Sequence, residues 1–339
     1  MYTIVTDYKL ISKQKWNNFV FNHPDGNIFH TPEMVELYEA TPKFESLVVG
    51  CFDEIQQLVG LLIAVIQKEY EGLLGKLTAR AIVYGGPLVM GNSPAVASLI
   101  IEAFDKLCKK KVVYSQFRNL WDVKKYSEIF SKQGYIFEDH LDILFNLKQG
   151  KEVLWKEIHP TRRKQINRGI KREIKTKIVD LLQPKELVLC YTILKSVYKE
   201  AKLPFPSIVY FTNAIKILIG LGYFKAVLAL YINEIIGFRF FLTYKGLLYD
   251  WYAGSRPEHY NKYPNDILPW EIIKWGAENG YDIFDFGGAG KPDKPYGVRD
   301  YKMKFGGTLV NYGRFEKSHK PFSMAIARIG FRAWKILNN

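Results

Sequence analysis

An order of predicted elements that occurs twice constrains this chain more than any other feature. Each half is expected to begin with a strand and two helices, to continue with three strands, and to end with a helix, a strand, a short helix and a strand. In the first half the segments are 4–5, 13–21, 32–40, 44–52, 57–69, 80–89, 94–110, 112–118, 126–133 and 135–147. In the second half they are 177–182, 184–201, 207–220, 224–232, 234–244, 247–253, 267–279, 282–286, a short helix near Arg299, and 308–315. The pattern indicates an internal duplication.

Paired sequence features support this interpretation. DEIQQLVGLLIAVI in the first half and NEIIGFRFFLTY in the second each place a polar turn before a strand with an early glycine, Gly60 or Gly237. The expected fold class is α/β (α+β), with two tandem domains that each contain a mixed, mostly antiparallel sheet flanked by helices. The predicted ranges are an N-terminal domain at 1–150, a basic connecting helix at 151–175, a C-terminal domain at 176–318 and a basic amphipathic tail helix at 319–339.

Composition excludes several classes of protein. The 339 residues are 48% hydrophobic and 24% charged, as in globular chains, so extensive disorder is not expected. The longest nearly pure apolar run, 58–66, is too short for a bilayer span, which needs about 20 residues. The N-terminus lacks a signal-peptide pattern, and three isolated cysteines favour neither a disulfide framework nor a zinc site. These features predict a cytoplasmic protein.

Positive charge is concentrated between the two halves. The chain carries 48 Lys and Arg against 34 Asp and Glu, a net charge of +14, which favours anionic partners. The stretch TRRKQINRGIKREIKTK at 161–177 holds eight basic residues and one acid, with isoleucines at four-residue spacing along one edge. It is either a solvated surface helix or a contact for RNA or phosphate. The candidate nucleic-acid-binding residues are Arg162, Arg163, Lys164, Arg168, Lys171 and Arg172.

The tail at 321–337 combines isoleucines and Trp334 with Arg328, Arg332 and Lys335. A basic amphipathic helix of this kind either lies on an anionic membrane, which would place the protein at the inner face of the membrane, or docks on the body of the protein. The sequence leaves both alternatives open.

Common catalytic signatures are absent from the sequence. It has no GxxxxGK[ST], HExxH or GxSxG string, no strand-linked GxGxxG, and its six histidines lack ligand spacing, so neither a metal site nor a nucleophilic serine is expected. The run 249–305 instead concentrates aromatic residues, glycines, prolines and charges. Within it, the glycines of IFDFGGAG let the backbone approach a ligand closely. A Pro-rich loop leads into the helix near 267, whose first N–H groups would be offered to an anion. RDYKMKFGG clusters cations, as an oxyanion site requires.

In this order these segments resemble the C-terminal half of the FemABX peptidyltransferases and their BioF2-like acetyltransferase relatives, which belong to the GNAT superfamily. The resemblance rests on Ala253-Gly254-Ser255, the segment 264–270, the strand 284–288, and Tyr301-Lys302 followed by Phe305-Gly306. Trp16, NIFHTPEM and Gly85-Gly86-Pro87 extend it into the first half. It implies two GNAT-like domains around a shared cleft.

The resemblance also implies a function. Fem-type enzymes transfer an amino acid from aminoacyl-tRNA to an amine of a lipid-linked or UDP-linked peptidoglycan precursor, with no cofactor beyond these co-substrates. By position Lys302 matches the family's catalytic lysine and Tyr301 its aromatic neighbour, and Lys302 would offset the negative charge of a tetrahedral intermediate. Candidate substrate-binding residues are Tyr252, Arg256, Trp270, Asp285, Gly287, Gly288 and Arg299. A monomer or weak dimer is expected.

One departure from the family pattern keeps other functions open. The family commonly has an acidic residue shortly after the Gly-Pro strand, but this chain continues Leu88-Val89-Met90-Gly91. An acyl-CoA-dependent N- or O-acetyltransferase of a cell-envelope sugar or polysaccharide is the first alternative, although the string at 57–61 lacks the final small residue of the [QR]xxGx[GA] loop. The second alternative is a non-catalytic duplicated scaffold that binds nucleic acid or an envelope partner.

Overall fold

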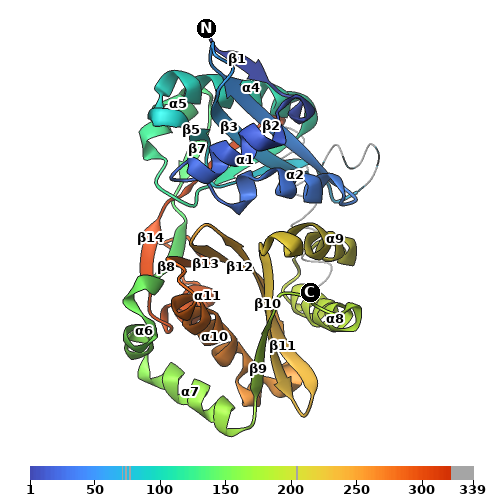
Figure 1. The fold of residues 1–339 in the computed structure, drawn as a ribbon, viewed down its shortest axis with the longest axis vertical. Coiled ribbons are helices and arrows are strands. Elements are labelled where there is room, and N and C mark those ends of the chain that lie inside the picture. The colour runs from blue at the N-terminus through green and yellow to red at the C-terminus, as the bar shows by residue number, and fades with distance from the viewer. Residues whose placement is uncertain (71, 73–74, 76–77, 204, 322–339) are drawn as a thin grey trace. The chain divides into compact units, whose positions relative to one another are not determined.

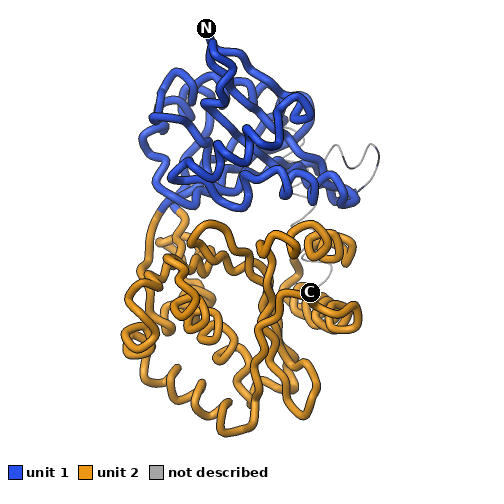
Figure 2. The backbone as a smooth tube through the Cα atoms, viewed as in Figure 1, with its two compact units in different colours: residues 1–139, 312–339 blue, residues 140–311 orange. Residues whose placement is uncertain are grey.

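The structure is a computed structural model that describes the chain except for residues 71, 73–74, 76–77, 204 and 322–339. It forms two compact units (Figure 2). Unit 1 contains residues 1–139 and the segment that begins at Tyr312, and unit 2 contains 140–311. Each unit is built around one sheet with its own hydrophobic core.

Unit 1 has an eight-stranded sheet in the order β1-β2-β3-β4-β6-β15-β7, with β5 paired to β3 (Figure 1). Only the β4–β6 pair is parallel. Its strands are β1 (Thr3–Val5), β2 (Phe44–Phe52), β3 (Leu58–Gln67), β4 (Arg80–Tyr84), β5 (Leu88–Val89), β6 (Tyr114–Arg118), β7 (Ile136–Glu138) and β15 (Arg314–Ser318). The helices are α1 (Lys13–Asn22), α2 (Pro32–Glu39), α4 (Pro94–Lys111) and α5 (Ser127–Lys132).

Unit 2 has a seven-stranded sheet in the order β14-β8-β13-β12-β11-β10-β9, in which only β12 and β13 are parallel. Its strands are β8 (Leu141–Asn146), β9 (Lys175–Val179), β10 (Phe224–Tyr231), β11 (Glu234–Tyr244), β12 (Leu247–Ser255), β13 (Ile283–Gly290) and β14 (Thr308–Asn311). The helices are α6 (Lys151–Glu157), α7 (Pro160–Lys171), α8 (Pro184–Glu200), α9 (Ile208–Leu218), α10 (Pro264–Glu278) and α11 (Gly297–Met303). The two mixed, mostly antiparallel sheets flanked by helices confirm the predicted fold class.

Two predicted strands each change sheet halfway along. The expected strand 135–147 is β7 in the first sheet followed by β8 in the second, and the expected strand 308–315 is β14 followed by β15. Gly313 permits the second change, because its φ of +65° is open to glycine and a Cβ there would lie 2.1 Å from the Phe137 ring. The units therefore differ from the predicted ranges 1–150 and 176–318.

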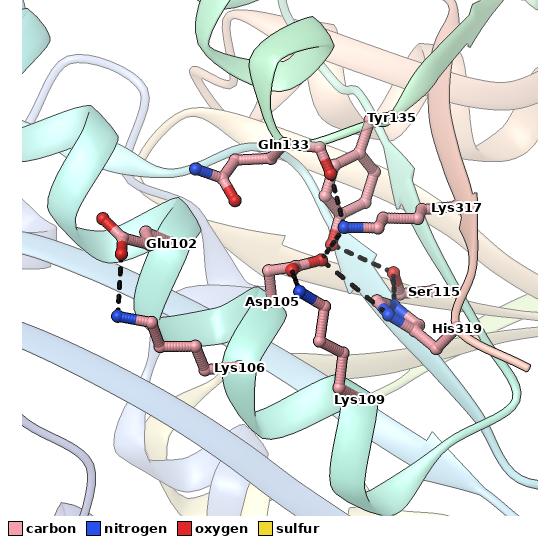
Figure 3. A network of polar contacts seen from close by, with 9 residues as sticks. All are labelled: Glu102, Asp105, Lys106, Lys109, Ser115, Gln133, Tyr135, Lys317 and His319. Atoms are coloured by element: carbon pink, nitrogen blue, oxygen red, sulfur yellow. Dashed lines mark hydrogen bonds and ion pairs between the residues drawn. The ribbon is translucent and has the colours of Figure 1, made fainter.

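A buried polar network holds β15 in unit 1 (Figure 3). Asp105 of α4 is 1% exposed, and its carboxylate accepts a hydrogen bond from Lys317 of β15 at 2.5 Å and pairs with Lys109 at 3.2 Å. His319 follows the strand, and its Nε2 lies 2.8 Å from the Ser115 hydroxyl of β6. Burial lowers the pKa of His319 to about 4. A buried carboxylate needs such partners, so the network fixes this late strand to the first sheet.

The basic segment differs from the predicted connecting helix at 151–175. It forms two helices, α6 and α7, that are interrupted before Pro160, and both belong to unit 2. Proline fits the first turn of α7 but could not continue α6, which explains the interruption. Within the described ranges, no helix has the length and apolar character needed to cross a membrane. Residues 322–339 of the predicted tail helix lie outside the part of the chain that the structure describes.

Candidate functional site

The parallel strands β12 and β13 separate in the middle of the second sheet. They pair only from Leu247–Tyr249 to Ile283–Asp285. Beyond this point β12 stays paired with β11, while β13 stays paired with β8. Ligands of α/β sheets commonly bind at the carboxyl ends of such strands.

A β-bulge in β12 lies at the point of separation. Tyr252 pairs with Phe240 and Asp250 pairs with Phe241, so Trp251 is an extra residue in the register. A bulge bends its strand and increases the local twist, which moves β12 away from β13. The opening therefore follows from one inserted residue.

The corresponding strands of unit 1 stay together. Arg80–Tyr84 of β4 pair with Tyr114–Arg118 of β6 over their full length, and the Gly85 N–H extends the ladder to the Arg118 carbonyl at 2.8 Å. Trp121 packs on the next turn, because a Cβ at Gly85 would lie 2.7 Å from its ring. The candidate site is therefore in unit 2.

Lys302 of α11 lies at the opening. Its ammonium donates to the carbonyls of Phe286, Gly287 and Gly288 at 2.5, 3.0 and 3.2 Å. Gly287 has a φ of +78°, which turns these consecutive carbonyls toward one cation. Burial lowers the pKa of Lys302, and the nearby Asp250 carboxylate opposes this shift.

Two acids support the same glycine turn from β13 and β8. Asp285 is 2% exposed, accepts a hydrogen bond from the Gly287 N–H at 2.8 Å, and shares a hydrogen bond with Asp142. Burial and the adjacent Asp142 raise the pKa of Asp285 well above its ordinary value. Two carboxyl groups joined by a hydrogen bond hold one proton between them. The raised pKa therefore favours the protonated form of Asp285 beside Asp142.

A second charged group connects β11, β12 and α11. Arg239 donates to the Asp250 carboxylate at 2.5 Å and to the Tyr301 hydroxyl at 3.4 Å, and it stacks on the Phe286 ring at 5.0 Å. Tyr301 in turn donates to the carbonyl of Asn265 at 2.5 Å. Arg239 and Asp250 were not among the residues predicted from the sequence. The sequence signal that could have indicated them is a single charged residue within an apolar strand, because a charge buried there requires a partner.

The basic helix α7 also contributes to this site. Arg162 is buried, pairs with Asp266 of α10, and lies over the rings of Tyr301 and Phe305 at 4.8 Å each. Its predicted role on a nucleic-acid surface is therefore wrong, because the side chain faces inward. Its contacts instead fix the orientation of the ring next to Lys302.

The other basic residues of α7 lie outside this cluster. Arg172 donates to the Asn261 carbonyl and stacks on Tyr263, so it ties the end of α7 to the loop before α10. Arg163 is half-buried and donates to carbonyls of α6. A shallow depression of about 450 Å³ is lined by Pro160, Arg163, Lys164, Asn167, Arg168 and Lys171. Lys164, Arg168 and Lys171 thus remain exposed on one outward face, beside the half-buried Arg163.

The structure brings some of the predicted substrate-binding residues together and separates others. Asp285, Gly287 and Gly288 lie against Lys302, as described above, and Tyr252 joins an aromatic cluster with Phe211 at 4.9 Å. The remaining three have structural contacts. Trp270 is buried against Trp155, Arg299 closes the loop 289–294 through three carbonyls, and Arg256 lies 3.9 Å from Glu234.

The start of α10 does not offer the anion site that the sequence suggested. Pro264 has no N–H, and the N–H groups of Asp266 and Ile267 both donate to the Tyr263 carbonyl. Asp266, in the first turn, is buried and pairs with Arg162, so its carboxylate is also engaged. An incoming pyrophosphate would therefore find these groups already used.

Comparison with known proteins identifies the domain type. Residues 161–303 match the family model of the acetyltransferase (GNAT) domain, and this range contains Lys302, Asp250 and α7. Comparison with proteins of curated function gives no match. The matched range lies within unit 2, where the strands open.

Solved structures extend the likeness to the whole chain. FemX superposes with a TM-score of 0.71 at 13% identity, over 96% of this chain and 99% of FemX. A tandem GNAT protein from the clavulanic acid biosynthesis pathway gives 0.62 at 9% identity, over 94% and 99% of the chains. The C-terminal domain of a predicted lysylphosphatidylglycerol synthetase from Agrobacterium fabrum gives 0.60 at 12% identity, over 93% and 94%. The chain therefore has a tandem GNAT-like fold, as FemX does, and residues 161–303 match the acetyltransferase (GNAT) domain model.

Proposed function

We propose that this protein is an aminoacyltransferase that moves an amino acid from aminoacyl-tRNA to an amine of a peptidoglycan precursor. The motif resemblance and the GNAT domain support acyl transfer. The observation that carries the tRNA assignment is the geometry of α7. This helix directs Arg163, Lys164, Arg168 and Lys171 outward while Arg162 contacts Tyr301 beside Lys302.

The proposed reaction needs orientation and charge stabilisation rather than a covalent intermediate with the protein. The acceptor amine attacks the ester carbonyl, the N–C bond forms, and the C–O bond to the tRNA ribose breaks. The amine loses a proton and the leaving ribose oxygen gains one, so the transfer is balanced without another reactant. Lys302, held by three carbonyls at the strand opening, is the cation available to the developing oxyanion.

An acyl-CoA donor is less well supported. GNAT enzymes that use CoA hold its pyrophosphate with backbone N–H groups at a helix start, and such sites need free donors. In α10 the N–H groups of Asp266 and Ile267 are internally bonded to the Tyr263 carbonyl. Acetyl-CoA is nevertheless the second donor to be tested, because the matched family is described by acetyl transfer.

The test is a mass-shift assay with purified protein and peptidoglycan precursor, supplied either with a charged tRNA pool or with acetyl-CoA. An increase in product mass by one amino-acid residue that disappears after RNase treatment supports the proposal. An acetyl increment would assign the protein to the CoA-dependent alternative, and no product in either arm would favour the binding scaffold. One structural neighbour is named as a synthetase of an aminoacylated lipid, so phosphatidylglycerol vesicles serve as a second acceptor.

Charge-reversal variants test the role of α7. The triple substitution Lys164→Glu, Arg168→Glu and Lys171→Glu should weaken tRNA binding and make its dependence on salt shallower, because each lysine or arginine removed from a phosphate means fewer counterions released on binding. Lys195→Glu with Lys199→Glu, on the exposed side of α8, is the matched control. Equal tRNA affinity in both variants would contradict the assignment of α7.

A further inference from the structure

Asp250 occupies the first position of β12 beyond the paired part of the two parallel strands. The last parallel pair joins Tyr249 to Asp285, so Asp250 begins the open segment. Across the opening stands Gly287, where even a Cβ would remain 3.9 Å from the Asp250 carbonyl and 3.5 Å from the Lys302 ammonium. The glycine leaves room for a small group between the strands.

The two oxygens of the Asp250 carboxylate have different surroundings. Oδ2 accepts a hydrogen bond from Arg239, which is itself buried. Oδ1 is shielded from solvent and has no hydrogen-bond partner among the described residues, and the whole side chain is 11% exposed. A buried acceptor without a donor costs free energy, and in native proteins such groups commonly mark a missing ligand or water.

The missing partner must be a hydrogen-bond donor small enough for the opening, and a cationic donor is preferred by a carboxylate. An acetyl group has no N–H to offer. An aminoacyl group carries an α-ammonium on the carbon next to the carbonyl that reacts. This ammonium would lie between the strands while its carbonyl faces Lys302.

We infer that Asp250 Oδ1 accepts a hydrogen bond from the α-ammonium of the donor aminoacyl group and so selects aminoacyl over simple acyl donors. This role of Asp250 rests on the proposed aminoacyl transfer and makes Asp250 the residue that recognises the donor's α-ammonium. Arg239 is the positioning residue, because its contacts with Oδ2 and with the Tyr301 hydroxyl fix the direction of Oδ1.

The test compares two stable analogues of a charged tRNA terminus, 3′-alanylamino-3′-deoxyadenosine and 3′-propionylamino-3′-deoxyadenosine. They differ only in the α-amine, so a difference in affinity cannot come from a larger side chain in the propionyl compound. Calorimetric titration of the full chain should show the propionyl compound binding at least about tenfold more weakly, as expected for a hydrogen bond to a charged group. Asp250→Asn should remove this difference, whereas Asp293→Asn, an exposed aspartate of the same unit, should retain it.

The outcomes separate this inference from the proposed function. Equal binding of both compounds by the wild type would overturn the role of Asp250 while leaving aminoacyl transfer supported. Binding of acetyl-CoA and of neither adenosine compound would overturn the proposed function and the inference together. Because the wild-type comparison needs no variant, poor folding of Asp250→Asn would not prevent a decision.

Discussion

The Lys302 ammonium lies 2.5 Å from the carbonyl oxygen of Phe286 and bonds the next two carbonyls as well. All three of its N–H groups can therefore be engaged by backbone before a substrate arrives. The lysine stabilises the glycine turn at the strand opening. To bind an oxyanion, its ammonium would have to give up one of the two longer hydrogen bonds, to Gly287 or Gly288. Lys302 thus serves both the local structure and the proposed chemistry.

Replacing Lys302 tests this double role. Lys302→Met keeps the length of the side chain but removes every donor, so we expect transfer to fall by about 10²- to 10³-fold, as for other oxyanion donors. We also expect a lower unfolding temperature, because three carbonyls lose their partner. Steady-state kinetics should show the loss mainly in kcat. Lys304→Met, at the exposed end of the same helix, is the control, and wild-type turnover in Lys302→Met would exclude the assigned role.

The order of elements could be predicted from the sequence because apolar alternation and Gly or Pro boundaries are local properties. The change of sheet within 135–147 and 308–315 could not. Each segment keeps a strand pattern across the break, so the pattern does not show which sheet each part joins. That depends on the partner strands: β8 pairs with β13 and β14, whereas β15 pairs with β6 and β7. Pairing between distant strands is not encoded in a local pattern.

The candidate site divides in the same way. Lys302 and Tyr301 were predicted by position through the family resemblance, and Asp285 lies in a short strand segment with several glycines. Arg239 and Asp250 come from separate strands, and the unpaired Asp250 oxygen depends on the bulge at Trp251, which no local pattern reveals. Arg162 was assigned to the wrong surface, because charge density in a helix does not show which cation faces a buried acid.

Arg162 should be important for stability even though it lies in a basic helix. Arg162→Met leaves Asp266 buried without its cation, and breaking such a pair costs about 3–5 kcal/mol. Urea denaturation should show this loss, whereas Lys164→Met, two residues later in the chain and exposed, should change the free energy of unfolding little. In the double variant Arg162→Met/Asp266→Asn part of the loss should return, since no uncompensated charge remains. Equal stability of both single variants would contradict the buried pair.

Gly169 reports on the contact between α7 and α10. A Cβ at this position would lie 2.3 Å from the Ile267 side chain and 2.9 Å from the Lys262 carbonyl, and the backbone atom cannot give way easily. Gly169→Ala should therefore lower the free energy of unfolding by about 1–3 kcal/mol despite the better helix propensity of alanine. Gly220→Ala, where a Cβ would meet nothing within 4 Å, is the control. A stabilised Gly169→Ala protein would mean that the two helices do not pack this closely.

His30 should make unit 1 sensitive to acid. The ring is fully buried between the Gly86 carbonyl at 3.0 Å and the Asn27 side chain at 3.1 Å, and burial lowers its pKa from 6.5 to about 4. Between these values the unfolded chain binds a proton that the folded chain does not. Stability from this group is therefore complete above pH 6.5 and decreases as the pH falls toward 4, by roughly 3 kcal/mol in total.

The measurement is urea denaturation of the full chain in steps of 0.5 pH units from pH 7.5 to 4. His30→Gln keeps hydrogen-bonding capacity without titrating, so its free energy of unfolding should fall less steeply over this range than that of the wild type. His319 has a pKa lowered to about 4 as well and acts in the same direction, so only the double variant His30→Gln/His319→Gln should lose most of the acid dependence. If His30→Gln retained the full wild-type slope, the buried ring would have to be protonated in the folded protein, with both of its nitrogens donating to Gly86 and Asn27.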